Sequence, residues 1–164
     1  KRSEGLIFQT LYQIHKLITL IFTGKKVNFG NYSCLTKKDI NILSDKASLW
    51  SSFSGTIKKN LTNLNETDST RGLRYFGPSK MSLLNLVIHS FSIIAVFKYT
   101  VFLRSTFIII LLSFLIKTLG SIAIIFQVLI VFFNLLIFIV SLRESQKELI
   151  ESNNNLLNEN EIAH

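Results

Sequence analysis

The sequence is poor in cysteine, in histidine and in acidic side chains. Its one cysteine, Cys34, excludes an intrachain disulfide and a cysteine-based metal cluster. The histidines are scattered, and the sequence shows no Ser/His/Asp arrangement, glycine-rich phosphate loop or metal-ligand spacing. Residue types alone therefore identify no catalytic centre.

Charge is distributed unevenly along the chain. Residues 1–104 carry fifteen Lys or Arg but only five Asp or Glu, and the whole chain has a formal net charge of +8. Such a charge favours nucleic acid, anionic lipid head groups or phosphorylated substrates as partners. A long apolar stretch follows this basic region and favours the lipid and the phosphorylated substrate, so we expect no nucleic-acid partner.

Methionine and proline each occur once, at Met81 and Pro78. Both lie in a basic stretch, residues 71–81, RGLRYFGPSKM, between a polar region and an apolar one. Because the first residue is Lys1, we expect the chain to continue a longer protein. The opening residues lack the apolar core of a signal peptide.

The apolar stretch covers residues 106–142 and contains one charge, Lys117. A membrane-spanning helix needs about 20 apolar residues, so this length fits two spans or one long helix with an outlying piece. The polar break around Gly120 favours two spans, and we predict a transmembrane hairpin over 105–142. Arg104 then lies at the interface, where its long side chain can reach the head groups.

The positions of the cations predict the orientation. Most Lys and Arg precede the apolar stretch, which predicts an integral membrane protein whose residues 1–104 are cytoplasmic. A hairpin returns the polar tail, 143–164, to the same side. The end of this tail is too polar to bury a core.

Two segments of the basic region show helical periodicity. Over 79–104, apolar residues recur at helical spacing, which predicts amphipathic juxtamembrane helices in the plane of the interface. A buried helix of a soluble core is the alternative. The first segment, up to Gly24, is also predicted to be an amphipathic helix.

Short elements are expected between these helices. An alternating stretch around Gly30 predicts one short strand. Thr36 followed by Asp39 predicts the capped start of a helix, and another short helix is expected over 46–60. The predicted fold class is therefore mostly α with a few short strands.

Four phosphate-competent side chains gather in the basic stretch, namely Arg71, Arg74, Ser79 and Lys80. Arginine can hold a phosphate through two parallel hydrogen bonds, and lysine adds a point charge. One such loop can bind a diphosphate or a lipid phosphate at the membrane surface. On charge alone, a basic anchor that fixes the topology and binds no specific ligand is an equally good interpretation.

A resemblance to a known family is carried by residues 70–97, TRGLRYFGPSKMSLLNLVIHSFSIIAVF. This stretch resembles the end of the catalytic domain in membrane-bound family 2 glycosyltransferases, the branch that includes dolichyl- and polyprenyl-phosphate sugar synthases. In that branch an Arg-x-x-Gly-x-Ser-Lys-Met pattern, matched here by residues 74–81, leads into juxtamembrane helices and a transmembrane pair. Upstream, GKKVNFGNYSCLTKKDINIL is similar to the family's Gly-Asn/Asp-Phe-x-x-Leu segment. The resemblance covers roughly residues 1–110 in one consistent order.

The resemblance implies that residues 1–78 are the C-terminal part of a GT-A glycosyltransferase domain, which is an α/β fold. It implies sugar transfer from a nucleotide diphosphate-sugar donor to a polyprenyl phosphate or another membrane-proximal acceptor. It also implies a divalent metal, Mg or Mn, in the full-length enzyme, with an Asp-x-Asp pair and other ligands that this chain lacks. A homo-oligomer is compatible with the same interpretation.

Site residues follow from the resemblance position by position. Arg74 and Lys80 would contact the donor diphosphate or the acceptor phosphate, and Ser79 would support their loop. Asn31 stands where part of the family has an Asp, so it cannot act as a base but can hydrogen-bond a sugar hydroxyl. Arg2 matches an arginine often found in the loop over the active site.

The competing interpretation is a noncatalytic membrane protein. A small two-span protein or accessory subunit with a basic cytoplasmic face needs the same hairpin but no phosphate site. The upstream coding sequence distinguishes the two classes, because only the enzyme requires an Asp-x-Asp segment there.

Overall fold

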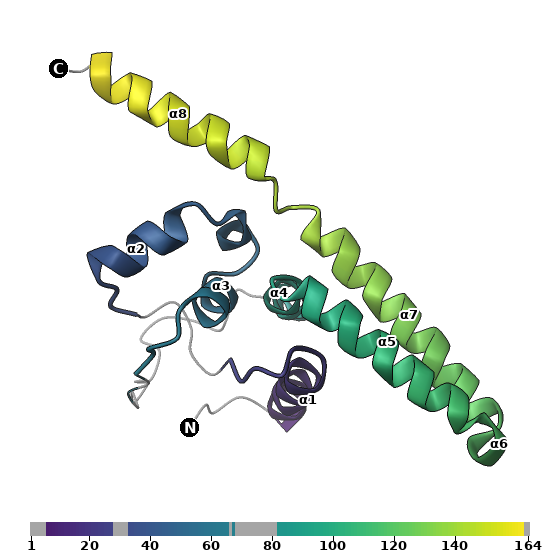
Figure 1. Cartoon of the computed structure of the whole chain (residues 1–164). Coiled ribbons are helices and arrows are strands. Elements are labelled where there is room, and N and C mark those ends of the chain that lie inside the picture. The colour runs from purple at the N-terminus through teal and green to yellow at the C-terminus, as the bar shows by residue number, and fades with distance from the viewer. Residues whose placement is uncertain (1–5, 28–32, 66, 68–81, 163–164) are drawn as a thin grey trace.

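The computed structural model describes residues 6–27, 33–65, 67 and 82–162 (Figure 1). All regular elements in these ranges are helical: α1 (Leu6–Thr23), α2 (Lys37–Ser44), the 3-10 turn η1 (Ala47–Trp50), α3 (Phe53–Asn60), α4 (Leu83–Ala95), α5 (Lys98–Phe114), α6 (Ile116–Leu119), α7 (Ser121–Ser141) and α8 (Gln146–Ile162). The prediction of a mostly helical chain is confirmed. The described residues contain no strand, and Gly30, the centre of the predicted strand, lies outside them.

The longest feature is an antiparallel pair formed by α5 and α7, with the short helix α6 at its tip (Figure 1). Gly120 closes the turn with φ +57°, a conformation that glycine adopts without steric cost, and its N–H donates to the Ile116 carbonyl at 2.8 Å. This turn coincides with the polar break in the apolar stretch. Gln127 of α7 ties the two helices together, because its Nε2 donates to the Ile109 carbonyl at 3.1 Å and to Ser113 Oγ at 2.8 Å.

Helix α7 begins the one described helix that is long and apolar enough to cross a membrane. Only 17% of its most apolar window is buried, and large aliphatic and aromatic side chains such as Leu129 and Phe132 are exposed along it. A core helix of a soluble protein has the opposite distribution. Helices α4 and α5 together also meet the length and composition criterion, but they bend by 88° where they join.

This bend, the elbow, lies at Val96–Phe97. The predicted boundary between 104 and 105 does not coincide with the end of any element, because α5 continues from Lys98 through both positions. At the elbow the Phe97 N–H donates to the Ile94 carbonyl at 2.9 Å, a tighter turn than the α-helix makes. No proline or glycine marks this break in the sequence.

A small polar-surfaced unit, consisting of α2, η1 and α3, packs around Leu43, Ile57 and Leu61. Its helices begin at capping side chains. Thr36 and Asp39 form the predicted capping box, and Ser52 Oγ accepts from the Gly55 N–H at 3.1 Å. Gly55 also allows α3 to approach α4 closely, since a Cβ there would lie 3.2 Å from the Ile93 carbonyl oxygen.

The main apolar cluster joins α1, α4, α5 and α7. Its buried members are Ile94, Ala95, Val96, Phe97, Val101 and Ile137. From α1, Ile18 and Phe22 pack against this cluster, and the Phe22 ring lies 4.6 Å from that of Phe133 on α7. In Figure 1 both α1 and α4 are seen end-on while α5 and α7 run across the view, so both cross the hairpin steeply near the same end.

Candidate functional site at the elbow between α4 and α5

The residues predicted to bind substrate or phosphate all lie outside the part of the chain that the structure describes. They are Arg2, Asn31, Arg71, Arg74, Ser79 and Lys80. Their roles therefore stay predictions. Description resumes at Ser82, whose Oγ accepts from the Asn85 N–H at 3.2 Å and starts α4. The basic stretch thus runs directly into a capped helix that leads to the elbow.

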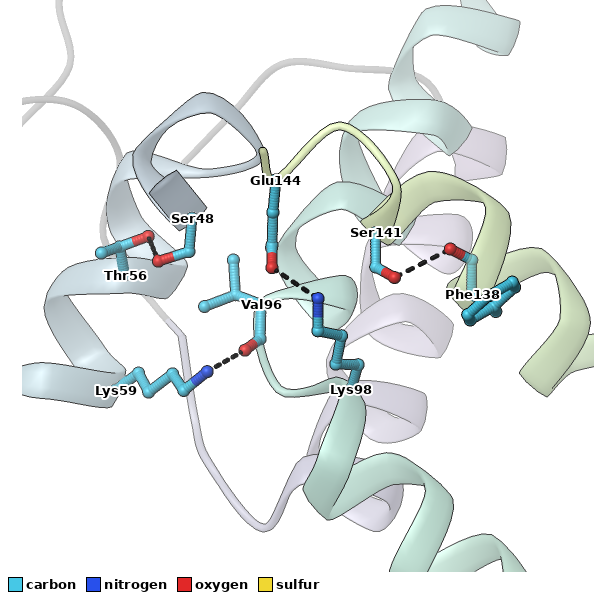
Figure 2. Close-up of polar contacts among 8 residues, drawn as sticks. All are labelled: Ser48, Thr56, Lys59, Val96, Lys98, Phe138, Ser141 and Glu144. Carbon is cyan, nitrogen blue, oxygen red and sulfur yellow. Dashed lines mark hydrogen bonds and ion pairs between the residues drawn. The ribbon is translucent and has the colours of Figure 1, made fainter. Parts of the chain in front are cut away.

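The elbow is held from outside by a lysine of α3. Lys59 Nζ donates to the Val96 carbonyl oxygen at 2.6 Å (Figure 2), and Val96 is fully buried. A carbonyl at a helix break lacks its regular partner four residues later, so a buried one needs another donor. The long side chain of Lys59 supplies this donor and links the polar-surfaced unit to the elbow.

An ion pair closes the other side of the elbow. Lys98 Nζ, at the first residue of α5, lies 3.1 Å from Glu144 Oε2, just beyond the end of α7 (Figure 2). The side chains are 21% and 8% exposed, so the pair is largely withdrawn from water. The other carboxylate oxygen of Glu144 is buried and has no hydrogen-bond partner. The pair joins the two helix ends of the hairpin opposite its tip.

Burial is the main influence on Lys59 in this cluster. It lowers the pKa of Lys59, and the nearby charges of Lys98 and Lys46 lower it further, whereas Glu144 raises it. The carboxylate of Glu144 therefore acts on both Lys98 and Lys59.

A second contact joins α1 to α5. Arg104 Nη1 donates to the Ile21 carbonyl at 3.1 Å, in the last turn of α1. Gly24 follows with φ +70°, and a Cβ at this position would collide with the Arg104 guanidinium. In the structure the Arg104 guanidinium caps the C-terminal end of α1, where a cation is stabilising, and its place at the membrane interface stays a prediction.

No group of three or more His, Cys, Asp or Glu side chains lies close enough together to hold a metal ion within the described ranges. These residues do not fit the divalent cation that the resemblance implies.

Sequence reasoning missed the roles of Lys59, Lys98 and Glu144. A usable signal was present for two of them, because Lys98 precedes the apolar stretch and Glu144 is the first acidic residue after it. Opposite charges at the two ends of a hairpin are expected to meet. Lys59 had no such signal, since its partner is a backbone carbonyl.

No family model, curated protein or solved structure matches the chain.

Proposed function

We propose that this chain is the C-terminal, membrane-anchoring part of a glycosyltransferase. The enzyme would transfer a sugar from a nucleotide diphosphate-sugar to a polyprenyl phosphate or another membrane-proximal acceptor. The sequence resemblance carries the chemistry of this proposal. The structural observation that supports it best is the 88° elbow at the end of α4, the helix that follows the basic stretch.

The elbow determines the level at which the basic stretch approaches the membrane. If α5 and α7 cross the membrane, α4 lies close to the membrane plane, because it is nearly perpendicular to α5. Leu84 and Val87, one helical turn apart on α4, are exposed and suit an interfacial helix. The segment that precedes Ser82 then approaches at the level of the lipid head groups, which is where a lipid phosphate presents itself.

The proposed chemistry uses the cations of the basic stretch. A phosphate oxygen of the lipid acceptor would attack the anomeric carbon of the donor sugar, and the bond from that carbon to the nucleotide diphosphate would break. Arg74 and Lys80 would stabilise the charge of the departing diphosphate or orient the acceptor phosphate. A lipid phosphate is already an anion, so this attack needs little base assistance, and Asn31 would contribute only hydrogen bonding.

The test begins with the coding sequence upstream of Lys1 in the same reading frame. An open frame with an Asp-x-Asp segment is expected, and its absence would leave the noncatalytic membrane protein as the better interpretation. The full-length enzyme, in its membrane, is then assayed for sugar transfer to polyprenyl phosphate.

Arg74→Ala is expected to lower turnover at least about tenfold, which corresponds to about 1.4 kcal/mol of transition-state stabilisation. Arg143→Ala is the matched control. It removes an exposed cation just beyond the end of α7 and should leave turnover close to wild type. Wild-type turnover in the Arg74 variant would remove the phosphate-binding role.

A further inference from the structure

Helix α1 exposes more aliphatic surface than a surface helix of a soluble protein does. Toward α4 and α5 it packs Ile18 and Phe22 against the main apolar cluster and buries two hydroxyl residues, Thr19 and Thr23. Away from this side it exposes three aliphatic residues, Ile14, Leu17 and Ile21, at 47%, 58% and 45%, and Leu11 and Leu20 are exposed as well. A surface helix in water turns its polar residues outward instead.

The buried hydroxyls are satisfied within the helix itself. Thr19 Oγ1 donates to the His15 carbonyl at 2.8 Å, and Thr23 Oγ1 donates to the Thr19 carbonyl at 2.6 Å. They therefore need no water and no partner from another element. The two buried hydroxyls of α1 therefore have partners within the helix. These hydrogen bonds do not explain why the three aliphatic residues are exposed.

These three residues form a single stripe. They stand at positions i, i+3 and i+7, which share one face of an α-helix. A different side carries Gln13, Lys16 and the exposed Leu20, and the Lys16 ammonium lies 4.7 Å from the centre of the Tyr12 ring. Helix α1 thus has one side toward the protein, one aliphatic side and one mixed side with polar residues, an aromatic ring and a cation, as helices at a membrane surface have.

The contact between Arg104 and Ile21 fixes the height of α1 along the hairpin. Arg104 lies six residues after Lys98, the start of α5, so the contact is about 9 Å down the helix axis at 1.5 Å per residue. An amphipathic helix in a bilayer interface lies about 5–10 Å deep, at the boundary between head groups and acyl chains. With the Lys98–Glu144 pair at the membrane surface, α1 lies at this boundary.

We propose that the stripe of Ile14, Leu17 and Ile21 is a lipid-contacting surface, embedded at the boundary between head groups and acyl chains. The occupant is the bilayer itself. The exposed apolar surface of the hairpin continues beyond α1 and belongs to the same lipid environment. Arg104 attaches α1 at the correct depth. This inference rests on the membrane placement in the proposed function and is independent of sugar transfer.

The test measures depth, because the hairpin alone would bring the full chain to vesicles. Cys34 is exposed and is first replaced by Cys34→Ser. Single-cysteine variants Ile14→Cys, Gln13→Cys and Leu129→Cys are then labelled with an environment-sensitive fluorophore. Ile14 and Gln13 are neighbours that point about 100° apart around the helix, so they form a matched pair. All three positions are exposed, so the labels disturb little packing.

The labelled chains are placed in vesicles of phosphatidylcholine and phosphatidylglycerol that contain a nitroxide-bearing lipid. The nitroxide lies near the head group in one preparation and within the acyl chain in another. The label at Ile14 should be quenched by the shallow nitroxide at least about threefold more strongly than the label at Gln13. The label at Leu129 on α7 should be quenched by the deep nitroxide and reports whether the hairpin is embedded.

The two proposals fail in different ways in this experiment. If Leu129 is quenched but Ile14 and Gln13 behave alike, the lipid surface on α1 is disproved while the membrane placement stands. If Ile14 is shielded from both the nitroxide lipids and a water-soluble quencher, a protein surface covers the stripe, and the proposal is also wrong. If Leu129 is not quenched either, the membrane placement itself is overturned.

Discussion

The hairpin of α5 and α7 and the polar-surfaced unit of α2, η1 and α3 bury their apolar side chains to different extents. The polar-surfaced unit buries Leu43 and Ile57, and the helices α2 and α3 both begin at a hydroxyl cap. The hairpin exposes most of its apolar side chains, and neither α5 nor α7 has a side-chain cap at its start. The polar-surfaced unit also exposes Ile40 and Trp50, so the two regions differ in how much of their apolar surface they bury rather than in kind.

The two regions also differ in where their polar contacts lie and in how much these contacts contribute to stability. In the polar-surfaced unit, the cap of α2 is exposed, so water could also satisfy that helix end and the cap contributes modestly, whereas the Ser52 cap of α3 is buried. In the hairpin, the polar contacts between helices lie at the elbow, where the Lys98–Glu144 pair is largely buried, and at Arg104 and Gln127, whose contacts are more exposed. We therefore expect the same kind of substitution to have unequal effects in the two regions.

The largest effect is expected at the elbow. Glu144→Gln removes the charge that neutralises Lys98, which is only 21% exposed, and should destabilise the full chain by about 3 kcal/mol. The control is Glu151→Gln, whose carboxylate lies 4.0 Å from Lys147 Nζ with both side chains mostly exposed, and its effect should stay below about 0.5 kcal/mol. Unfolding in detergent micelles measures both variants. Equal losses would show that the elbow pair is no stronger than a surface pair.

An intermediate effect is expected at the two glycines with positive φ. Gly24→Ala and Gly120→Ala each place a side chain at positive φ, which costs at least about 1 kcal/mol, and Gly120 also has ψ −136°, a combination that is essentially restricted to glycine. Only Gly24→Ala also displaces Arg104 from the end of α1, because nothing lies within 4 Å of a Cβ at Gly120.

Loss of the Arg104 contact should add about 1 kcal/mol to the cost of Gly24→Ala. In the same micelles, Gly24→Ala should therefore cost about 1 kcal/mol less in an Arg104→Ala background, where this contact is already lost, than in the wild-type background. An equal cost in both backgrounds would mean that Arg104 contributes nothing by capping α1.

The smallest effect is expected at the start of α2. The Thr36 hydroxyl donates to Asp39 Oδ2 at 2.7 Å and the Thr36 N–H donates at 3.1 Å, and these bonds lower the pKa of Asp39 below its usual value of 3.8. The stabilisation from this carboxylate is therefore present above pH 3.8 and is lost as the pH falls through the folded-state pKa.

Thr36→Val should move the pKa of Asp39 up toward the usual value, as followed by NMR titration of its carboxyl carbon. Ser44→Ala is the control, since the Ser44 hydroxyl donates to the Asn41 carbonyl at 3.1 Å and does not contact Asp39. An unchanged Asp39 titration in the Thr36 variant would show that the backbone N–H alone accounts for the lowered pKa.

Much of the helical framework could be predicted from local signals. Thr36 with Asp39 marks the start of α2, Gly24 follows the end of α1, and Gly120 closes the hairpin turn. Each of these signals acts within a few residues of the feature that it predicts. The fold class was therefore correct as mostly helical.

The elbow could not be predicted, for a physical reason. The sequence around Val96 is apolar and uninterrupted, and the break depends on a lysine 37 residues earlier that bonds to the freed carbonyl. A break that is stabilised by tertiary contacts leaves no local signal. The phosphate-binding residues were predicted from chemistry and resemblance alone, and their positions lie outside the described chain.

The contacts at the elbow also set an order of assembly during synthesis. Glu144 is made 46 residues after Lys98, and Gln146, whose Nε2 bonds to the Asp45 carbonyl at 3.1 Å, is made 101 residues after Asp45. Neither contact can form until α7 has left the ribosome. The earlier helices can already form the contact between Lys59 and Val96, and completion of the second hairpin helix adds the contacts of Glu144 and Gln146 to it.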